Sequence, residues 1–365
     1  MRSPNNKSAD KKSNLTKLTK SKRAVVETQF NWVFIVIAGA MILVFFIMVI
    51  NKQKDISDTK LAIEILDSID KIIYGQKISE NREDVVVISE TEFSYDCGGC
   101  SCTLSIGEVS KAKGNTIIFM PSHLKSNFLA VWTQSWDMPF KIANFVYMTV
   151  PEIRYYFVKP SDSFKREFIE KLPQNLTYSI VDDANSIIYK GEQAIRIVYL
   201  DSSSIPSLPP SLKGISDPLV TALVIDNTVG EWYNGKSKFA FYKKKGYSFI
   251  EDKDEKGEYS YPAWGIQSAY GALYSDNAQS FRCNMEDALQ RMEFVAAVYK
   301  SKTEKLGNDA INNVINAACS LSYGTAPFNN LLKPDLKNPA NVFNSINVLR
   351  WANDNAILLS CPRIY

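Results

Sequence analysis

Six cysteines are the residues with the clearest chemical potential in this chain of 365 residues. They are Cys97, Cys100, Cys102, Cys283, Cys319 and Cys361. An even number of cysteines in an oxidising compartment favours disulfides, and the sequence alone does not choose among the pairings. The close cluster of three could instead hold a metal, although a structural zinc site needs four ligands. We expect disulfides, with metal binding and unpaired thiols as the alternatives.

Three aspartates form a second group with chemical potential, because each follows the carboxyl end of an expected strand. They are Asp182, Asp201 and Asp226. Ligands bind at this edge of open parallel sheets, and carboxylate oxygens suit Mg²⁺ or Ca²⁺. Aspartate is also common where a turn begins or a helix is capped. We favour the turn role and keep a metal-dependent hydrolase as the alternative, and we predict no cofactor.

Other catalytic signatures do not occur in the sequence. It contains no G-x-S-x-G elbow, P-loop, H-E-x-x-H or G-x-G-x-x-G motif. The one histidine, His123, lies in the polar segment MPSHLKSN, where a surface position is usual. Asn175, followed by Leu176 and Thr177, fits the acceptor pattern for N-glycosylation. These observations favour a non-catalytic protein over an enzyme.

A long apolar segment at residues 30–50 predicts how the chain is held in the cell. Its sequence, FNWVFIVIAGAMILVFFIMVI, carries no charge, and as a helix it would be about 30 Å long, the thickness of a bilayer core. Eight basic residues precede it, and only Lys52 and Lys54 follow closely. The positive-inside rule therefore places the N-terminus in the cytoplasm and residues 51–365 outside, on a single-pass anchor in the cell membrane.

The segment before the anchor differs in charge from the rest of the chain. Residues 1–29 hold eight basic and two acidic residues, so the remainder is slightly acidic although the formal net charge is +3. We predict a disordered cytoplasmic tail over 1–29. An acidic outer part does not favour a nucleic-acid partner, and the lipid bilayer is the partner that the tail and anchor predict.

A helical stalk is expected over residues 51–76. Ala62, Ile65, Ile69 and Ile72 recur at helical spacing and form one apolar stripe, and Gly75 is expected to end the helix. The stripe could join copies of the chain in a short coiled coil, or it could pack on the chain's own domain. The stripe is short for a coiled coil, so we favour packing on the domain.

The outer part is expected to be an α/β domain over 77–263 followed by a helical C-terminal region over 264–365. Apolar runs such as YYFV and IRIVYL, separated by helix-like segments, predict a mixed, partly parallel sheet. Lys238–Tyr242 and Tyr247–Glu251 flank a glycine turn and predict a hairpin. Aromatic residues are densest from Trp132 to Phe157, which indicates either a packed core or a surface for a glycan or peptide.

Several stretches together resemble a known group of proteins. QFNWVFIVIAGAMILVFF, VWTQSWDMPFKIANFVY, RCNMEDA and the terminal SCPRIY are similar to segments of single-pass membrane proteins from small-genome, host-associated archaea. The resemblance implies an anchored extracytoplasmic domain. It implies no activity and no catalytic residue.

The sequence therefore predicts a membrane-anchored interaction or assembly protein whose partner is another cell-surface protein or a glycan. A pilin-like surface subunit is a further alternative. Archaeal pilin precursors resemble this chain in having a basic leader before a hydrophobic helix, and Lys22-Arg23-Ala24 precedes Val25-Val26-Glu27 here. In the pilin pattern the acidic residue is the fifth of the mature chain, whereas Glu27 would be the third.

Overall fold

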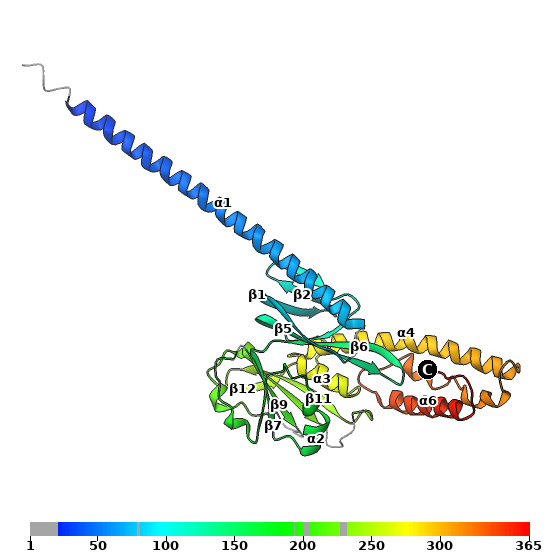
Figure 1. Ribbon diagram of the computed structural model, residues 1–365. Helices are drawn as coiled ribbons and strands as arrows, with labels where there is room; N and C mark the ends of the chain where they lie inside the picture. Colours follow the sequence, from blue (N-terminus) through cyan, green and yellow to red (C-terminus); the bar gives the residue numbers. More distant parts are fainter. Residues whose placement is uncertain (1–20, 79–80, 193, 201–204, 227–231) are drawn as a thin grey trace, which may run out of the picture. The chain divides into compact units, whose positions relative to one another are not determined.

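The computed structural model describes residues 21–78, 81–192, 194–200, 205–226 and 232–365, without the side chains of 21–31 and 76–78. The chain divides into two compact units, one ending at Leu61 and the other running from Ala62 to Tyr365. The second unit contains both sheets and all helices after α1 (Figure 1). The regions 77–263 and 264–365, which the sequence analysis separated, therefore belong to the same compact unit.

One continuous helix, α1 (Ser21–Ile78), takes the place of the expected tail end, anchor and stalk. It passes Gly75, so the predicted end of the stalk helix is wrong, and it begins at Ser21, within the expected disordered tail. The apolar side chains from Trp32 to Ile50 are almost all exposed. The helix is long and apolar enough to cross a membrane.

The last part of α1 belongs to the second unit and is amphipathic. Ala62, Ile65, Leu66, Ile69 and Ile73 are buried, four of them in the main hydrophobic core. On the polar face, the ammonium of Lys111 lies 2.8 Å from Asp67 and 3.0 Å from Asp70. The apolar stripe of the predicted stalk is thus occupied by the chain's own domain, as favoured above.

The first sheet is mainly antiparallel. Its strands are β1 (Glu83–Gly98), β2 (Ser101–Ile106), β3 (Val109–Ala112), β4 (Ile117–Phe119), β5 (His123–Asp137) and β6 (Lys141–Thr149). They lie in the order β3-β2-β1-β5-β6-β4, and only β4 and β6 run parallel. The long strand β1 pairs with β5 with a register shift between Val87 and Thr91.

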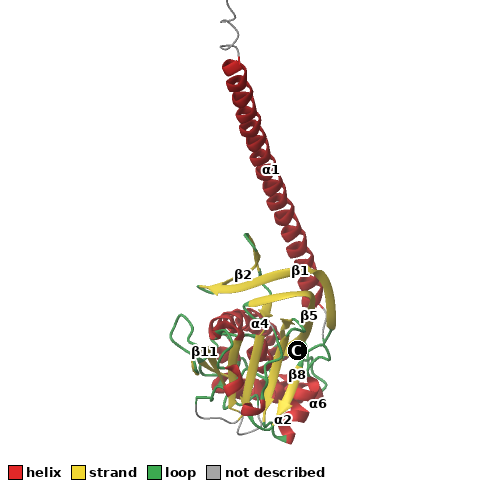
Figure 2. Cartoon of the chain, turned by 90° about the vertical axis from the view of Figure 1, so that its left-hand side faces the viewer, coloured by secondary structure: helices red, strands yellow, loops and turns green. Residues whose placement is uncertain are grey.

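The second sheet contains the predicted parallel strands. It consists of β7 (Ile153–Val158), β8 (Tyr178–Val181), β9 (Ala194–Leu200), β10 (Val220–Asp226), β11 (Lys238–Lys245), β12 (Ser248–Glu251) and β13 (Ser260–Pro262). Along the order β12-β11-β10-β9-β7-β8, the last four strands are parallel and β11 and β12 form the expected hairpin. A mixed, partly parallel sheet is confirmed, and Figure 2 shows its strands in yellow.

Helices complete the fold, and most of the α-helices after α1 follow residue 264. The α-helices are α2 (Asp162–Glu167), α3 (Ile266–Tyr274), α4 (Ala278–Ile311), α5 (Phe328–Leu331) and α6 (Ala340–Leu358). Short 3-10 helices are η1 (Ile169–Lys171), η2 (Ala184–Ser186), η3 (Pro210–Leu212), η4 (Asp217–Leu219) and η5 (Ala317–Ser322). The predicted helical C-terminal region is confirmed.

Helix α3 contacts both sheets. The hydroxyl of Tyr147 on β6 donates to the carbonyl of Gln267, while Arg196 on β9 donates to the carbonyl of Ala272. Gly271 allows the close packing, because a Cβ there would lie 2.9 Å from the ring of Phe119 on β4. The two sheets therefore pack against the same short helix, and this arrangement positions the cavity described below.

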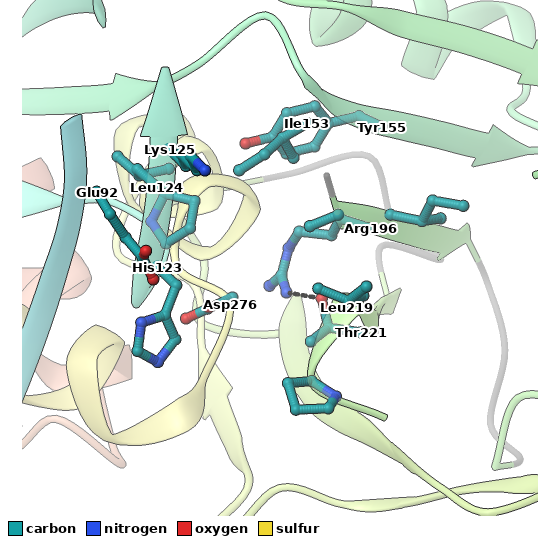
Figure 3. A pocket seen from close by; sticks show the side chains of 14 residues that line it. Glu92, His123, Leu124, Lys125, Ile153, Tyr155, Arg196, Leu219, Thr221 and Asp276 are labelled. Atoms are coloured by element: carbon teal, nitrogen blue, oxygen red, sulfur yellow. Dashed lines mark hydrogen bonds between the residues drawn. The ribbon is translucent and has the colours of Figure 1, made fainter. Parts of the chain in front are cut away.

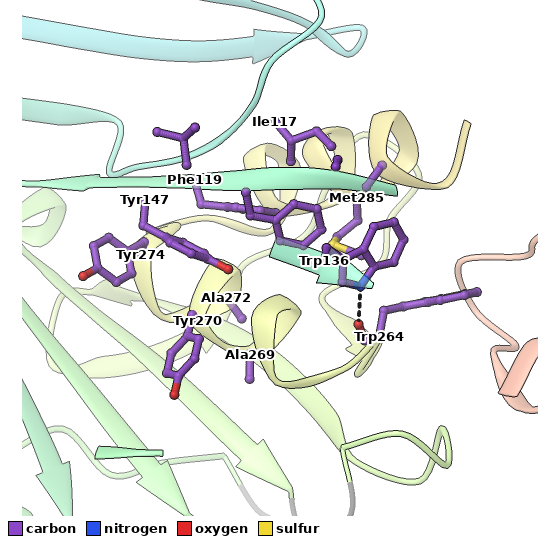
Figure 4. Close-up of a cluster of buried hydrophobic side chains, with 14 of the residues drawn as sticks. Ile117, Phe119, Trp136, Tyr147, Trp264, Ala269, Tyr270, Ala272, Tyr274 and Met285 are labelled. Carbon is purple, nitrogen blue, oxygen red and sulfur yellow. Dashed lines mark hydrogen bonds between the residues drawn. The ribbon is translucent and has the colours of Figure 1, made fainter. Parts of the chain in front are cut away.

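Aromatic side chains fill the space around α3 (Figure 4). Trp136 and Trp264 are fully buried, and the indole nitrogen of Trp136 donates to the Trp264 carbonyl at 2.9 Å. The rings of Trp132, Tyr147 and Tyr270 meet one another at tilted or edge-to-face angles. The aromatic region from Trp132 to Phe157 is thus largely core, which is the first of the two roles expected for it.

Candidate functional site

The cysteines form three disulfide pairs. Cys97 pairs with Cys102 across the β1–β2 hairpin, where the two residues are also register partners. Cys100 pairs with Cys283 of α4, and Cys319 pairs with Cys361. No cysteine is free. The expectation of disulfides is confirmed: in the cysteine cluster, Cys97 and Cys102 join the two strands of the hairpin, and Cys100 attaches the hairpin to α4.

The aspartates of the metal hypothesis do not converge in the part that the structure describes. Asp182 follows β8 and Asp226 ends β10, and strands β7 and β9 lie between these two. Adjacent strands are about 4.8 Å apart, so the two strand ends are about 14 Å apart. Carboxylates at that separation do not reach one ion with ligands at about 2.3–2.6 Å. Asp201 lies outside the described residues.

The residue that follows Asp182 has the turn role that is common for aspartate. Asp183 accepts a hydrogen bond from the backbone amide of Asn185 at 2.9 Å and caps η2. Across the described ranges, no group of three or more His, Cys, Asp or Glu side chains is arranged to hold a metal ion. Asn175, the predicted glycosylation acceptor, is exposed on the loop before β8.

A cavity of about 370 Å³ lies between the two sheets (Figure 3). Strands β1 and β5 of the first sheet contribute Glu92, His123 and Lys125, while β7, β9 and β10 of the second contribute side chains opposite them. Asp276 approaches from the link between α3 and α4. Half of the lining is apolar, so the cavity combines an apolar wall with a few charged groups.

Arg196 is the buried charge of this cavity. Its side chain starts on β9, is only 2 % exposed, and extends into the cavity (Figure 3). One terminal nitrogen donates to Thr221 Oγ1 at 3.1 Å and the other to the Ala272 carbonyl at 2.8 Å. Among the described residues, its Nε has no hydrogen-bond partner and no carboxylate lies within ion-pair distance. The guanidinium carbon lies 5.7 Å from the centre of the Phe241 ring.

Burial determines the electrostatics of the site. Removal from water lowers the pKa of Arg196 to about 10, although Asp276 favours the charged form from a distance. The group therefore stays protonated at neutral pH. Burial also raises the pKa of Tyr155 to about 12, and the Tyr155 hydroxyl bonds with Thr149 at 3.0 Å.

The register of the second sheet explains why these side chains meet. Tyr155 on β7, Arg196 on β9 and Thr221 on β10 are register partners in adjacent strands. Side chains in such a cross-strand row lie on the same face of a sheet. Asp276 is held in place from the other side, since its carboxylate accepts hydrogen bonds from the amide and hydroxyl of Ser122. The sheet register thus positions Arg196, and hydrogen bonds position Asp276 opposite it.

A second buried arginine has a different environment. Arg282 on α4 lies 2.7 Å from Asp254, 3.0 Å from Glu286 and 3.7 Å from Glu255. Asp254 also accepts a hydrogen bond from the hydroxyl of Tyr261. Carboxylates of the chain itself therefore compensate this guanidinium.

Comparison of the chain with protein-family models, curated proteins and solved structures found no match. The site is therefore interpreted from its own geometry and chemistry.

Sequence reasoning missed Arg196, Thr221 and Asp276. A signal was present, because Arg196 interrupts the apolar run AIRIVYL that forms a strand buried on both faces. A charge in such a strand requires a compensating partner. His123, expected at the surface, is exposed at the start of β5 and lines the cavity.

Proposed function

We propose that this protein is a membrane-anchored binding module whose domain over 62–365 lies outside the cytoplasm and recognises a partner or ligand without catalysis. The observation that carries the proposal is the contrast within α1. Its segment from Trp32 to Ile50 exposes apolar side chains around the whole helix, whereas the part after Ala62 buries only one stripe. Exposed apolar surface of this extent is stable in lipid and costly in water.

Cysteine chemistry supports the extracytoplasmic placement. All six cysteines lie after the apolar segment, and all six are at disulfide geometry. Disulfides persist in oxidising compartments and are rare in the cytosol of most organisms. The basic residues before the segment favour the same orientation by the positive-inside rule.

Thiol labelling of intact cells tests this placement. With a membrane-impermeant reductant followed by an impermeant maleimide, the six cysteines should be labelled without lysis. A Ser8→Cys variant serves as the matched control, because its thiol should react only after lysis. Labelling of the native cysteines that requires lysis would contradict the proposed orientation.

The membrane association has its own test. The full-length chain should remain in the pellet when membranes are washed at alkaline pH and centrifuged. Recovery of the intact chain in the supernatant without detergent would remove the anchor from the proposal.

Two alternatives have less support. The hydrolase would need Asp182, Asp201 and Asp226 at one ion, and the order of the second sheet keeps Asp182 and Asp226 apart. The pilin-like subunit would need cleavage after Ala24, within the first turns of α1. An intact N-terminal mass of the protein in purified membranes would exclude that cleavage.

A further inference from the structure

We propose that the cavity between the sheets binds a small monocarboxylate with an aliphatic body, whose carboxylate is held by the guanidinium of Arg196. The inference deepens the proposed binding role by naming a site and a class of ligand. Measurement of ligand affinity tests this inference, whereas thiol labelling of intact cells tests the proposed placement of the domain outside the cytoplasm. Failure of one is therefore distinguishable from failure of the other.

The first argument is charge. Arg196 is 2 % exposed, and its described partners, Thr221 and the Ala272 carbonyl, are neutral. A buried guanidinium without an anion is unfavourable, because the energy of hydration is lost and no ion pair replaces it. An anion that enters the adjacent cavity would supply the missing charge beside the guanidinium.

The second argument limits the charge of the ligand. Among the described residues of the cavity wall, Arg196 is the buried cation and Lys125 is exposed, and the carboxylates of Asp276 and Glu92 line the same space. A dianionic phosphate would bring a second negative charge toward those carboxylates, whereas a carboxylate balances the guanidinium alone. The planar fork of arginine also matches the geometry of a carboxylate.

The third argument concerns the rest of the ligand. Leu124, Ile153 and Leu219 contribute apolar surface to the wall, and the volume of about 370 Å³ is at the lower end of the range for small-molecule sites. A polar body would leave its groups unpaired against these side chains. A short aliphatic chain fits both the size and the lining.

Isothermal titration of the full chain in lipid nanodiscs tests the proposal with hexanoate as the probe. Hexanamide is the matched uncharged compound, and inorganic phosphate tests a different anion. Saturable binding of hexanoate to the protein is expected, with hexanamide and phosphate at least about tenfold weaker, since a hydrogen bond to a buried charge is lost or a second charge is repelled. Empty nanodiscs account for partition into lipid.

Two variants assign the site. Arg196→Met should weaken hexanoate binding at least about tenfold, because the cation is removed while the length of the side chain is kept. Arg154→Met is the matched control on the neighbouring strand, since Arg154 already pairs with Glu192 at 3.3 Å and points to the opposite face. It should bind hexanoate as the unchanged protein does.

A third variant covers the case in which Arg196→Met fails to fold. Leu219→Trp keeps the guanidinium but fills the cavity from its half-buried rim, and it should abolish binding. The proposal is overturned if hexanoate does not bind, if hexanamide binds equally well, or if Leu219→Trp leaves the affinity unchanged. Phosphate binding tighter than hexanoate binding would also overturn it.

Discussion

Two buried arginines show how differently one domain can treat the same charge. Arg282 on α4 is surrounded by Asp254, Glu255 and Glu286, whereas Arg196 on β9 has only neutral described partners and lies beside a cavity. Both side chains are excluded from water. The difference indicates that Arg282 stabilises the junction between α4 and the loop before β13, while Arg196 is available to an anion from outside the chain.

The largest effect should follow from breaking the compensated pair. Arg282→Met leaves the carboxylate of Asp254 buried without its cation, so we expect a loss of about 3–5 kcal/mol in the free energy of unfolding. Denaturant unfolding of the solubilised protein measures it. Lys256→Met is the control, because its ion pair with Glu286 is exposed and is worth about 1 kcal/mol or less. Equal losses in the two variants would show that the compensation around Arg282 has no special weight.

The region around Arg282 also differs from the cavity in having a disulfide beside it, between Cys100 and Cys283. The Cys100–Cys283 bond joins residues 183 positions apart, and its removal by the double change to serine should cost about 2–4 kcal/mol. The Cys97–Cys102 bond closes a separation of only 5, so its removal should cost less by the chain-entropy argument. A greater loss from the short loop would contradict this ranking.

Alkaline pH should act on the cavity through Tyr155. Burial raises its pKa to about 12, so the folded state keeps the phenol neutral where the unfolded chain ionises it. The contribution of Tyr155 to stability is complete below pH 10 and is lost as the pH rises toward 12, by about 3 kcal/mol in all. Arg196 acts in the opposite sense in this range, since loss of its proton above a pKa of about 10 favours the folded state.

Comparison with Tyr155→Phe isolates the tyrosine, because Arg196 is present in both proteins. The variant should lose less stability between pH 9 and 12, as measured by unfolding at each pH. Identical pH profiles would show that Tyr155 is not held neutral by burial.

The smallest effect on stability should come from the uncompensated arginine. Arg196→Met removes a buried charge that has no described carboxylate partner, and such replacements are often neutral or stabilising. The variant also leaves Thr221 and the Ala272 carbonyl without a donor, which opposes the gain by about 1 kcal/mol for each bond. We expect a net change within about 1 kcal/mol. A loss as large as that of Arg282→Met would mean that Arg196 is structural.

The parts of the fold that depend on local pattern could be predicted from sequence. An apolar run without charge specifies the exposed part of α1, and continuous apolar runs specify the parallel strands β7 and β9. The even number of cysteines indicates disulfides, but the Cys100–Cys283 pair depends on α4 lying beside the β1–β2 hairpin. That contact joins distant parts of the chain, and no local pattern encodes it.

The cavity depends still more on long-range packing. Its walls come from two sheets that pack against the same helix α3, and the close packing at Gly271 cannot be predicted from helical periodicity. The acidic-site hypothesis placed Asp182 and Asp226 at ends of parallel strands, but the sequence did not reveal that β7 and β9 separate β8 from β10. Arg196 was detectable as a charge within an apolar strand, whereas its partners Thr221 and Ala272 follow only from the register and from the position of α3.

The most direct test of the central claim observes the Nε–H group of Arg196 itself. Arginine-labelled protein in nanodiscs, studied by NMR, should show one Nε–H resonance that is lost in Arg196→Met. We predict that hexanoate shifts this resonance with the same concentration dependence as the heat of binding, while the resonance lost in Arg282→Met stays unchanged. An Arg196 resonance that does not move at saturating hexanoate would contradict the account.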